Sequence, residues 1–213
     1  MSQIHLENTK NKPKQLRAEV TATNIIESTL YITEIEKTPL DKISILDVAK
    51  KSGYSVGAVY RYFSDKQDIL SRLFGFYIKK VHNSCRDKLE LYPNTGNVRQ
   101  LAILMIDHYL DDLKHRNINT ALTLYKVFIQ NTTHPEQISN AIDILINPLY
   151  NIMKNDKTGT FRPPNRDQIK INLRGLAHML RSTYLEQNPY GHSSEYRELL
   201  IENAVSLFGK VKF

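Results

Sequence analysis

Three helix starts lie within residues 44–70, and only a few residues separate each helix from the next. Ser44 and Asp47 have the spacing of a capping box, in which the serine hydroxyl accepts a backbone N–H and the acid adds negative charge near the helix start. Gly53 can take the left-handed conformation that ends this helix, and Ser55 can cap the next one. Two short helices joined by a tight glycine-containing turn predict a helix-turn-helix, a unit that places its second helix in the major groove of DNA.

The second short helix is expected over residues 56–63. At 3.6 residues per turn, Val59 and Phe63 share the inward face, and Val56 lies near that face. The opposite face carries two very small side chains and Arg61, so its backbone can approach base edges closely. Tyrosine hydroxyls on the two flanks are placed to meet the phosphates on either side of the groove.

A third helix is expected to begin at a second capping box, formed by Ser64 and Gln67. Lys66 lies in its first turn, where the helix dipole disfavours a positive charge. A phosphate outside the protein would explain this exception. An ordinary solvated lysine is the alternative interpretation.

Taken together, these positions resemble the DNA-binding region of the tetracycline-repressor-like (TetR) family of bacterial transcriptional regulators. The family pattern is a Thr or Ser cap, an Ile/Val-Ala pair, a small residue with Gly, a capped short helix with Tyr-x-x-Phe, and then Lys and a Leu-rich helix. The chain departs from the family over residues 31–42, because the family usually has an aromatic residue and a glycine there. The matching positions here are Ser44, Val48, Ala49, Ser52, Gly53, Ser55, Tyr60 to Phe63, Lys66 and Leu70.

The resemblance implies an all-α fold, with an N-terminal helix-turn-helix DNA-binding domain and a C-terminal helical domain that binds a ligand and dimerises. We expect a basic arm at residues 1–17, the DNA-binding domain at 18–66 and the C-terminal domain at 67–213. The expected partner is double-stranded DNA with a palindromic operator. The candidate DNA-contacting residues, from the helical wheel and the resemblance, are Ser44, Ser55, Val56, Gly57, Ala58, Tyr60, Arg61, Tyr62 and Lys66.

The charge balance agrees with a polyanionic partner without proving one. The 213 residues carry 29 Lys and Arg against 22 Asp and Glu, a net charge of +7. Lys10, Lys12, Lys14 and Arg17 stand against Glu7 alone at the start of the chain. This segment is interpreted as a basic arm, and a disordered, solubilising tail is the alternative.

The sequence indicates a cytoplasmic protein associated with the nucleoid rather than a membrane protein. Its first residues lack the apolar segment of a signal peptide, and the longest apolar run, residues 101–106, is far too short to span a membrane. Cys85 is the only cysteine, so it cannot form an intrachain disulfide. It is interpreted as a packing residue, with redox sensing as the alternative.

The remainder of the chain predicts helices, because apolar residues recur at spacings of three and four. Val20, Ile26 and Leu30 are expected to be buried by the first helix, and Pro148 is expected to kink the helix that contains it. The expected helices span residues 16–35, 65–91, 98–115, 119–131, 135–155, 166–187 and 194–211.

Apolar stripes on the last two helices have two interpretations. They could face the core of one chain, or they could pair two chains, as the resemblance implies, since the TetR family dimerises through its last two long helices. A dimer also fits a palindromic operator. On the second interpretation the dimerisation residues are Leu173, Leu176, Leu180, Tyr184, Leu200 and Leu207.

The central helices mix apolar bulk with a few polar tips, as small-molecule pockets do. We expect a small, largely apolar effector, since few charges are placed to face inward. His108 and His115 share a helical face, but no further ligand cluster completes a metal site, so no metal and no cofactor are expected. The candidate effector-binding residues are Met105, His108, Tyr109, Tyr125, Phe128, Met153 and His178.

Three function classes follow from these observations. The favoured one is a ligand-responsive repressor that a small molecule releases from its operator. The second is a DNA-bound scaffold of the TetR type that recruits a protein partner without an inducer. The third, an all-α enzyme with a vestigial helix-turn-helix, is disfavoured because the sequence shows no nucleophile–base pair and no phosphate-binding loop.

Overall fold

The computed structural model describes residues 12–115, 118–133, 136–185, 190–191 and 193–210. Within these ranges the regular elements are helices, apart from one isolated β-bridge between Phe161 and Gly209. The all-α class predicted from the sequence is therefore confirmed. The chain divides into two compact units, residues 1–73 and residues 74–213, so the division falls inside a helix and seven residues beyond the predicted boundary at 66.

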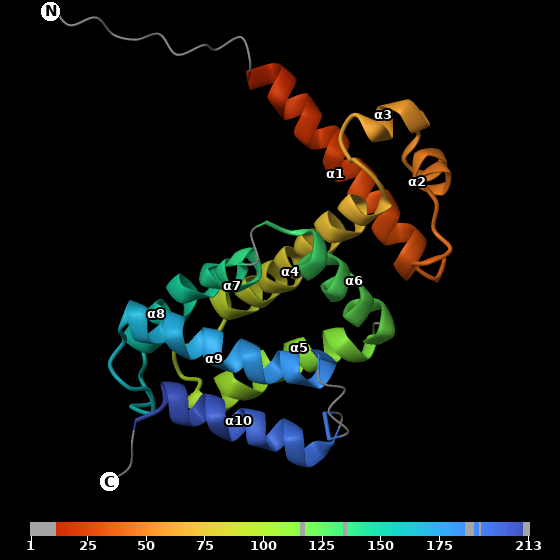
Figure 1. The fold of residues 1–213 in the computed structure, drawn as a ribbon. Helices are drawn as coiled ribbons and strands as arrows, with labels where there is room; N and C mark the ends of the chain where they lie inside the picture. Colours follow the sequence, from red (N-terminus) through yellow and green to blue (C-terminus); the bar gives the residue numbers. More distant parts are fainter. Residues whose placement is uncertain (1–11, 116–117, 134–135, 186–189, 192, 211–213) are drawn as a thin grey trace, which may run out of the picture. The chain divides into compact units, whose positions relative to one another are not determined.

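The first unit contains α1 (Lys12–Glu34), α2 (Ile45–Ser52), α3 (Val56–Tyr60) and the start of α4 (Lys66–Glu90), and α2 packs against both α1 and α3 (Figure 1). The predicted arm at 1–17 is too long, because helix α1 already begins at Lys12; residues 1–11 lie outside the described ranges. Ile26 is buried as predicted and Leu30 is half-buried. Val20 is 52% exposed, so the prediction that it is buried is wrong.

Lys37 and Lys51 shape the connection between α1 and α2, where the sequence departs from the family pattern. Lys37 has a φ of 56°, the left-handed region that glycine adopts more readily. Lys51 on α2 reaches back over this connection: its Nζ lies 2.7 Å from Glu36 Oε1 and 3.6 Å from the centre of the Tyr31 ring. A salt bridge and a cation–π contact thus tie α2 to the end of α1.

In the second unit, the predicted helix at 135–155 is in fact three pieces. Helix α7 passes into a 3₁₀ turn, η1, and α8 begins two residues before Pro148. Proline is tolerated in the first turn of a helix, since its missing N–H has no intrahelical partner there. The break therefore precedes Pro148. The helices of this unit after α4 are α5 (Val98–His115), α6 (Ile118–Asn131), α7 (Glu136–Ala141), η1 (Ile142–Leu145), α8 (Ile146–Lys154), α9 (Arg166–Leu185) and α10 (Ser194–Phe208).

Polar contacts fix α10 in this core. Helix α10 packs against α5 and α9, which lie beside it in Figure 1. Arg197 on α10 donates two hydrogen bonds to the Asp107 carboxylate on α5, at 2.6 and 2.7 Å. The buried Asn172 side chain on α9 donates to the Leu207 carbonyl at 2.7 Å. Such paired polar groups set the register of the three helices against one another.

The apolar stripes of α9 and α10 face this core. Leu173, Leu176, Leu180 and Leu200 are all buried within the single chain, and Leu207 is half-buried. These four leucines thus pack within a single chain, in keeping with the first of the two interpretations of the stripes. The side chain of Tyr184, the sixth predicted dimerisation residue, lies outside the described part of the structure.

Candidate nucleic-acid interface and effector cavity

Both short helices of the first unit start at the predicted caps. The Ser44 hydroxyl accepts the Asp47 N–H at 3.2 Å, and the Asp47 carboxylate accepts from the Ser44 N–H at 2.9 Å. Hydrogen bonds from the Ser44 side chain and backbone lower the pKa of Asp47. Ser55 Oγ accepts the Ala58 N–H at 3.1 Å, and Gly53 ends α2 with a φ of 75°. The turn between α2 and α3 is thus fixed on both sides.

Helix α3 is shorter than predicted and exposes the predicted face. It ends at Tyr60, although Tyr62 and Phe63 N–H groups still donate to the Val59 carbonyl. Val59 and Phe63 are buried, as expected. On the outer side Gly57 and Arg61 are exposed and Tyr60 is 53% exposed.

The remaining candidates lie around this face with different exposure. Val56, which the helical wheel placed near the buried face, is exposed, whereas Ala58 and Tyr62 are half-buried. The hydroxyl of Ser44 both accepts the Asp47 N–H and donates to the Asp47 carboxylate at 2.6 Å. The Ser55 hydroxyl only accepts a bond, so its proton remains available to a phosphate oxygen.

The start of α4 differs from the predicted capping box. Asp65 Oδ1 accepts the Asp68 N–H at 2.8 Å, and the Asp68 carboxylate accepts the Ser64 N–H at 3.1 Å. The cap is therefore one residue later than the predicted pair of Ser64 and Gln67. Lys66 is half-buried and has partners, because its Nζ donates to the Asp41 and Leu40 carbonyls at 3.1 and 3.4 Å. These carbonyls explain the cation in the first turn without any phosphate.

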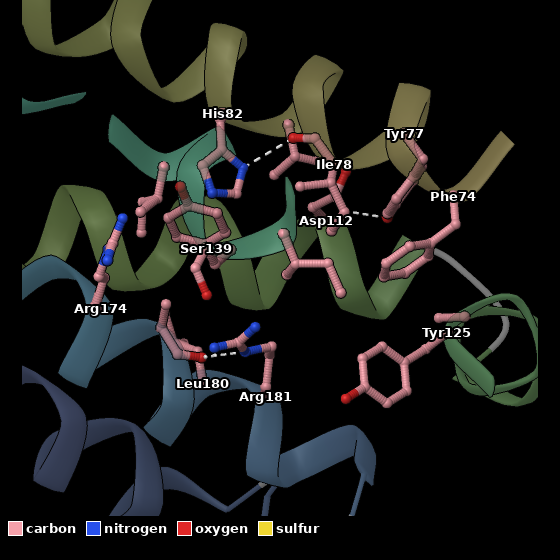
Figure 2. Close-up of a pocket in the computed structure, with 16 residues that line it drawn as sticks. Phe74, Tyr77, Ile78, His82, Asp112, Tyr125, Ser139, Arg174, Leu180 and Arg181 are labelled. Carbon is pink, nitrogen blue, oxygen red and sulfur yellow. Dashed lines mark hydrogen bonds between the residues drawn. The ribbon is translucent and has the colours of Figure 1, made fainter. Parts of the chain in front are cut away.

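The second unit contains a cavity of about 120 Å³, measured as the volume that the centres of water molecules can occupy. A cavity needs only about 10–15 Å³ on this measure to hold one water molecule, so there is room for a small organic molecule. Figure 2 shows side chains from several helices around this space. The lining residues are Phe74, Tyr77, Ile78, Val81 and His82 of α4; Tyr109 and Asp112 of α5; Ala121 and Tyr125 of α6; Ile138, Ser139 and Ile142 of α7 and η1; and Arg174, Ala177, Leu180 and Arg181 of α9.

Of the seven predicted effector-binding residues, only Tyr109 and Tyr125 line this cavity. His108 is pinned elsewhere, because its Nε2 lies 3.0 Å from the Val81 carbonyl oxygen. His178 is exposed on α9. Met105, Phe128 and Met153 are buried without lining the cavity.

The lining residues that the sequence analysis missed follow helical stripes. Those on α4 recur at spacings of three, one, three and one from Phe74 to His82, which places them on one face. Those on α9 lie between Arg174 and Arg181, and they include Leu180, which also belongs to the core stripe. These stripes were available as a signal, but nothing in the sequence alone shows which buried stripes enclose empty space.

The polar groups of the cavity wall are held in defined states. Tyr77 donates its hydroxyl proton to the Asp112 carboxylate at 2.5 Å. His82 Nδ1 lies 2.8 Å from the Ile78 carbonyl oxygen, an acceptor, so Nδ1 carries the proton and Nε2 is left as an acceptor (Figure 2).

Burial raises the pKa of Cys85 to about 12, which keeps its thiol protonated. A protonated thiol supports the packing interpretation of Cys85 over redox sensing.

His82 makes stability depend on pH. Burial, together with the nearby His108 and Arg181, lowers its pKa to about 4. The unfolded chain therefore takes up a proton near pH 6.5 while the folded chain stays neutral, so stability is full above about pH 6.5 and is lost as the pH falls toward 4. We expect the free energy of unfolding to drop by about 2 kcal/mol from this group between about pH 7 and pH 5.

The matched variants are His82→Gln and His178→Gln, measured by urea unfolding at both pH values. His82→Gln should remove that part of the pH dependence, and the exposed His178→Gln should keep it. Equal pH dependence in wild type and His82→Gln would show that His82 is not the titrating group.

The described residues contain neither a cluster of metal ligands nor a membrane-spanning helix. No group of three His, Cys, Asp or Glu side chains there is arranged to hold a metal ion. None of the helices found there combines the length and the apolar character needed to cross a bilayer.

Comparison with solved structures finds chains of the same fold. The TetR-family repressor AlkX from a Dietzia species is 14% identical, covers 87% of this chain and 98% of its own, and has a TM-score of 0.59. A tetR-family transcriptional regulator from Streptomyces coelicolor is 14% identical over 90% of this chain and 79% of its own, with a TM-score of 0.54. The fatty acid degradation regulator FadR from Bacillus halodurans is 14% identical over 90% and 96%, with a TM-score of 0.54. At such identities the likeness shows the fold.

The sequence itself matches a family model described as bacterial regulatory proteins, tetR family, over residues 33–73. These residues run from the end of α1 through α2 and α3 into α4, and so contain the helix-turn-helix. No curated protein matches the chain. Residues 33–73 thus match the tetR family of bacterial regulatory proteins, and the chain as a whole has the fold of solved TetR-family regulators.

Proposed function

We propose that this protein is a ligand-responsive repressor that binds a palindromic operator as a homodimer. The observation that carries the proposal is the outer face of α3, where Gly57, Tyr60 and Arg61 are exposed on a helix held by Ser55 and by the buried Val59. A rigid helix that presents a bare backbone and an arginine suits the major groove.

Within this proposal, α3 reads the bases and its surroundings hold the phosphates. Arg61 would pair with a guanine, and Tyr60, Tyr62 and Ser55 would donate to phosphates. Ser44 and Lys66 would bind phosphates only through N–H or O–H groups that do not already donate within the protein. Lys66 has two of its three N–H donors on carbonyls, which leaves one for a phosphate.

Arg61→Lys tests the base-reading role. Lysine keeps the positive charge but loses the planar pair of donors, so affinity for random duplex DNA and its salt dependence should stay close to wild type. Affinity for the preferred operator should fall by a factor that corresponds to roughly 1–3 kcal/mol, with a changed preference at one base pair of each half-site. Titrations against operators with single base-pair changes measure this. A uniform loss on every duplex would make Arg61 a backbone contact.

A second copy of the chain would pair through the outward faces of α9 and α10. There Ile171 is 64% exposed and Leu199 is 51% exposed, and the exposed Gly175 on α9 leaves room for a close neighbour. Large exposed apolar side chains on paired helices are typical of a surface that another helix pair covers. A two-fold dimer presents two copies of α3 to two half-sites, as a palindrome requires.

The cavity in the second unit supports the effector role over the scaffold alternative, since a scaffold needs no internal space. An effector that binds the DNA-free state more tightly must, by linkage, bind less tightly when the operator is present. The solved relative AlkX is described as a repressor implicated in the biodegradation of n-alkanes, in keeping with this kind of regulation. We propose no enzymatic activity, and we place the regulator with the DNA in the bacterial cytoplasm.

A further inference from the structure

Arg181 is a cationic side chain of the cavity wall that has no carboxylate partner among the described residues. It lines the cavity from α9, as Figure 2 shows. Its Nε donates to the Ala177 carbonyl at 3.2 Å, one turn earlier on the same helix. Among the described residues no carboxylate forms an ion pair with its guanidinium, and burial lowers its pKa. A half-buried, uncompensated cation is costly unless something neutralises it.

The charged and titratable groups that could compete with Arg181 make contacts within the protein, although the buried Tyr109 hydroxyl and Arg174 Nε have no hydrogen-bond partner in the described part of the chain. Arg174 donates to Asn140 at 3.0 Å and lies 3.4 Å from the Asp143 carboxylate. Asp112 accepts the Tyr77 hydroxyl, and His82 is neutral with its Nδ1 proton on a carbonyl. The guanidinium of Arg181 is thus the group best placed to receive an anion from outside.

Most of the remaining wall is apolar. Phe74, Ile78, Val81, Ile138, Ile142 and Leu180 contribute side chains, and Tyr125 extends toward the space from α6 (Figure 2). The open volume of about 120 Å³ is somewhat below the roughly 150 Å³ of a cavity known to hold benzene. A ligand that fills it has one ring or a short aliphatic chain.

We infer that the cavity binds a small monocarboxylate, with its charged head on the Arg181 guanidinium and its apolar body against the side chains of α4 and α7. A single carboxylate matches the one unpaired guanidinium, which can bind both carboxylate oxygens at once. A phosphate ester would bring close to two negative charges to one cation. This inference rests on the proposed function, in which the cavity is the effector site, and it replaces the fully apolar effector expected from the sequence.

The test compares acids with neutral molecules of the same shape. Benzoate, benzamide, hexanoate and hexanol are titrated into the full chain by calorimetry. The carboxylates should bind roughly tenfold or more tightly than their neutral counterparts, and Arg181→Gln should lose that advantage. Arg166→Gln is the matched control, because Arg166 lies on the same helix but outside the cavity, stacked over the Tyr150 ring.

The outcomes separate this inference from the proposed function. Equal binding of benzoate and benzamide to the wild type overturns the inference, and this comparison needs no variant to fold. Unchanged benzoate binding in a folded Arg181→Gln also overturns it. If carboxylates bind through Arg181 but never release operator DNA, the site stands and the effector role fails. If only neutral molecules release the DNA, the effector role stands and the inference fails.

Discussion

Gly57→Glu is expected to abolish DNA binding while leaving the chain folded. Gly57 is exposed on α3, and a Cβ built there meets no atom within 4 Å, so the protein has room for a larger side chain. In a helix, glutamate is also favoured over glycine by roughly 0.5–1 kcal/mol. On DNA, the same side chain would fill the space meant for base edges and bring a carboxylate to a polyanion. Like charges at an interface cost several kcal/mol, so affinity should fall roughly 100-fold or more.

The matched variants for this prediction are Gly57→Ala and Gly57→Gln. Alanine adds only the Cβ for which there is space, so it should bind DNA nearly as the wild type does. Glutamine has the size of glutamate without its charge and separates the steric from the electrostatic part. Fluorescence anisotropy with a labelled duplex, with circular dichroism as a check on folding, gives the answer. DNA affinity close to wild type in Gly57→Glu would place the DNA on another surface.

Leu176→Asp is expected to unfold the second unit rather than to separate a dimer. Leu176 is 2% exposed within one chain, packed in the core that α5, α9 and α10 share. An unpaired carboxylate there costs several kcal/mol, a large share of the roughly 5–15 kcal/mol that holds a typical protein folded. Thermal unfolding by circular dichroism should show the loss of stability.

Ile171→Asp is the control on the same helix. Ile171 is 64% exposed, so aspartate should leave the fold and its stability almost unchanged. If two chains pair through this face, the variant should be monomeric by light scattering. A stable, dimeric Leu176→Asp would contradict the core assignment, and a dimeric Ile171→Asp would move the interface away from this face.

The helix-turn-helix could be predicted from sequence because its signals are local. The box at Ser44, the cap at Ser55 and the left-handed Gly53 each depend on residues within one turn, and all three are confirmed. The end of α3 and the cap of α4 were less well predicted. Tyr60 ends the helix earlier than its apolar spacing suggests, and Asp65 competes with Ser64 for the same role.

The stripes and the cavity could not be predicted in the same way. A periodic apolar stripe such as that of Leu173 and Leu176 shows that a helix face is buried, but not whether its own chain or a second chain covers it. Lys66 donates to the carbonyls of Leu40 and Asp41, which lie far from it in the sequence. The cavity depends on the placement of five helices, so its charged residue Arg181 became visible only in the structure.

The central claim is that the chain binds a specific palindromic duplex through α3. Selection of bound duplexes from a random-sequence pool, with wild type and Gly57→Glu in parallel, tests it most directly. The account predicts that the wild type enriches an inverted repeat whose half-sites present successive major grooves about one helical turn apart, and that Gly57→Glu enriches nothing. A wild type that enriches no sequence, or a Gly57→Glu variant that enriches the same repeat, would contradict it.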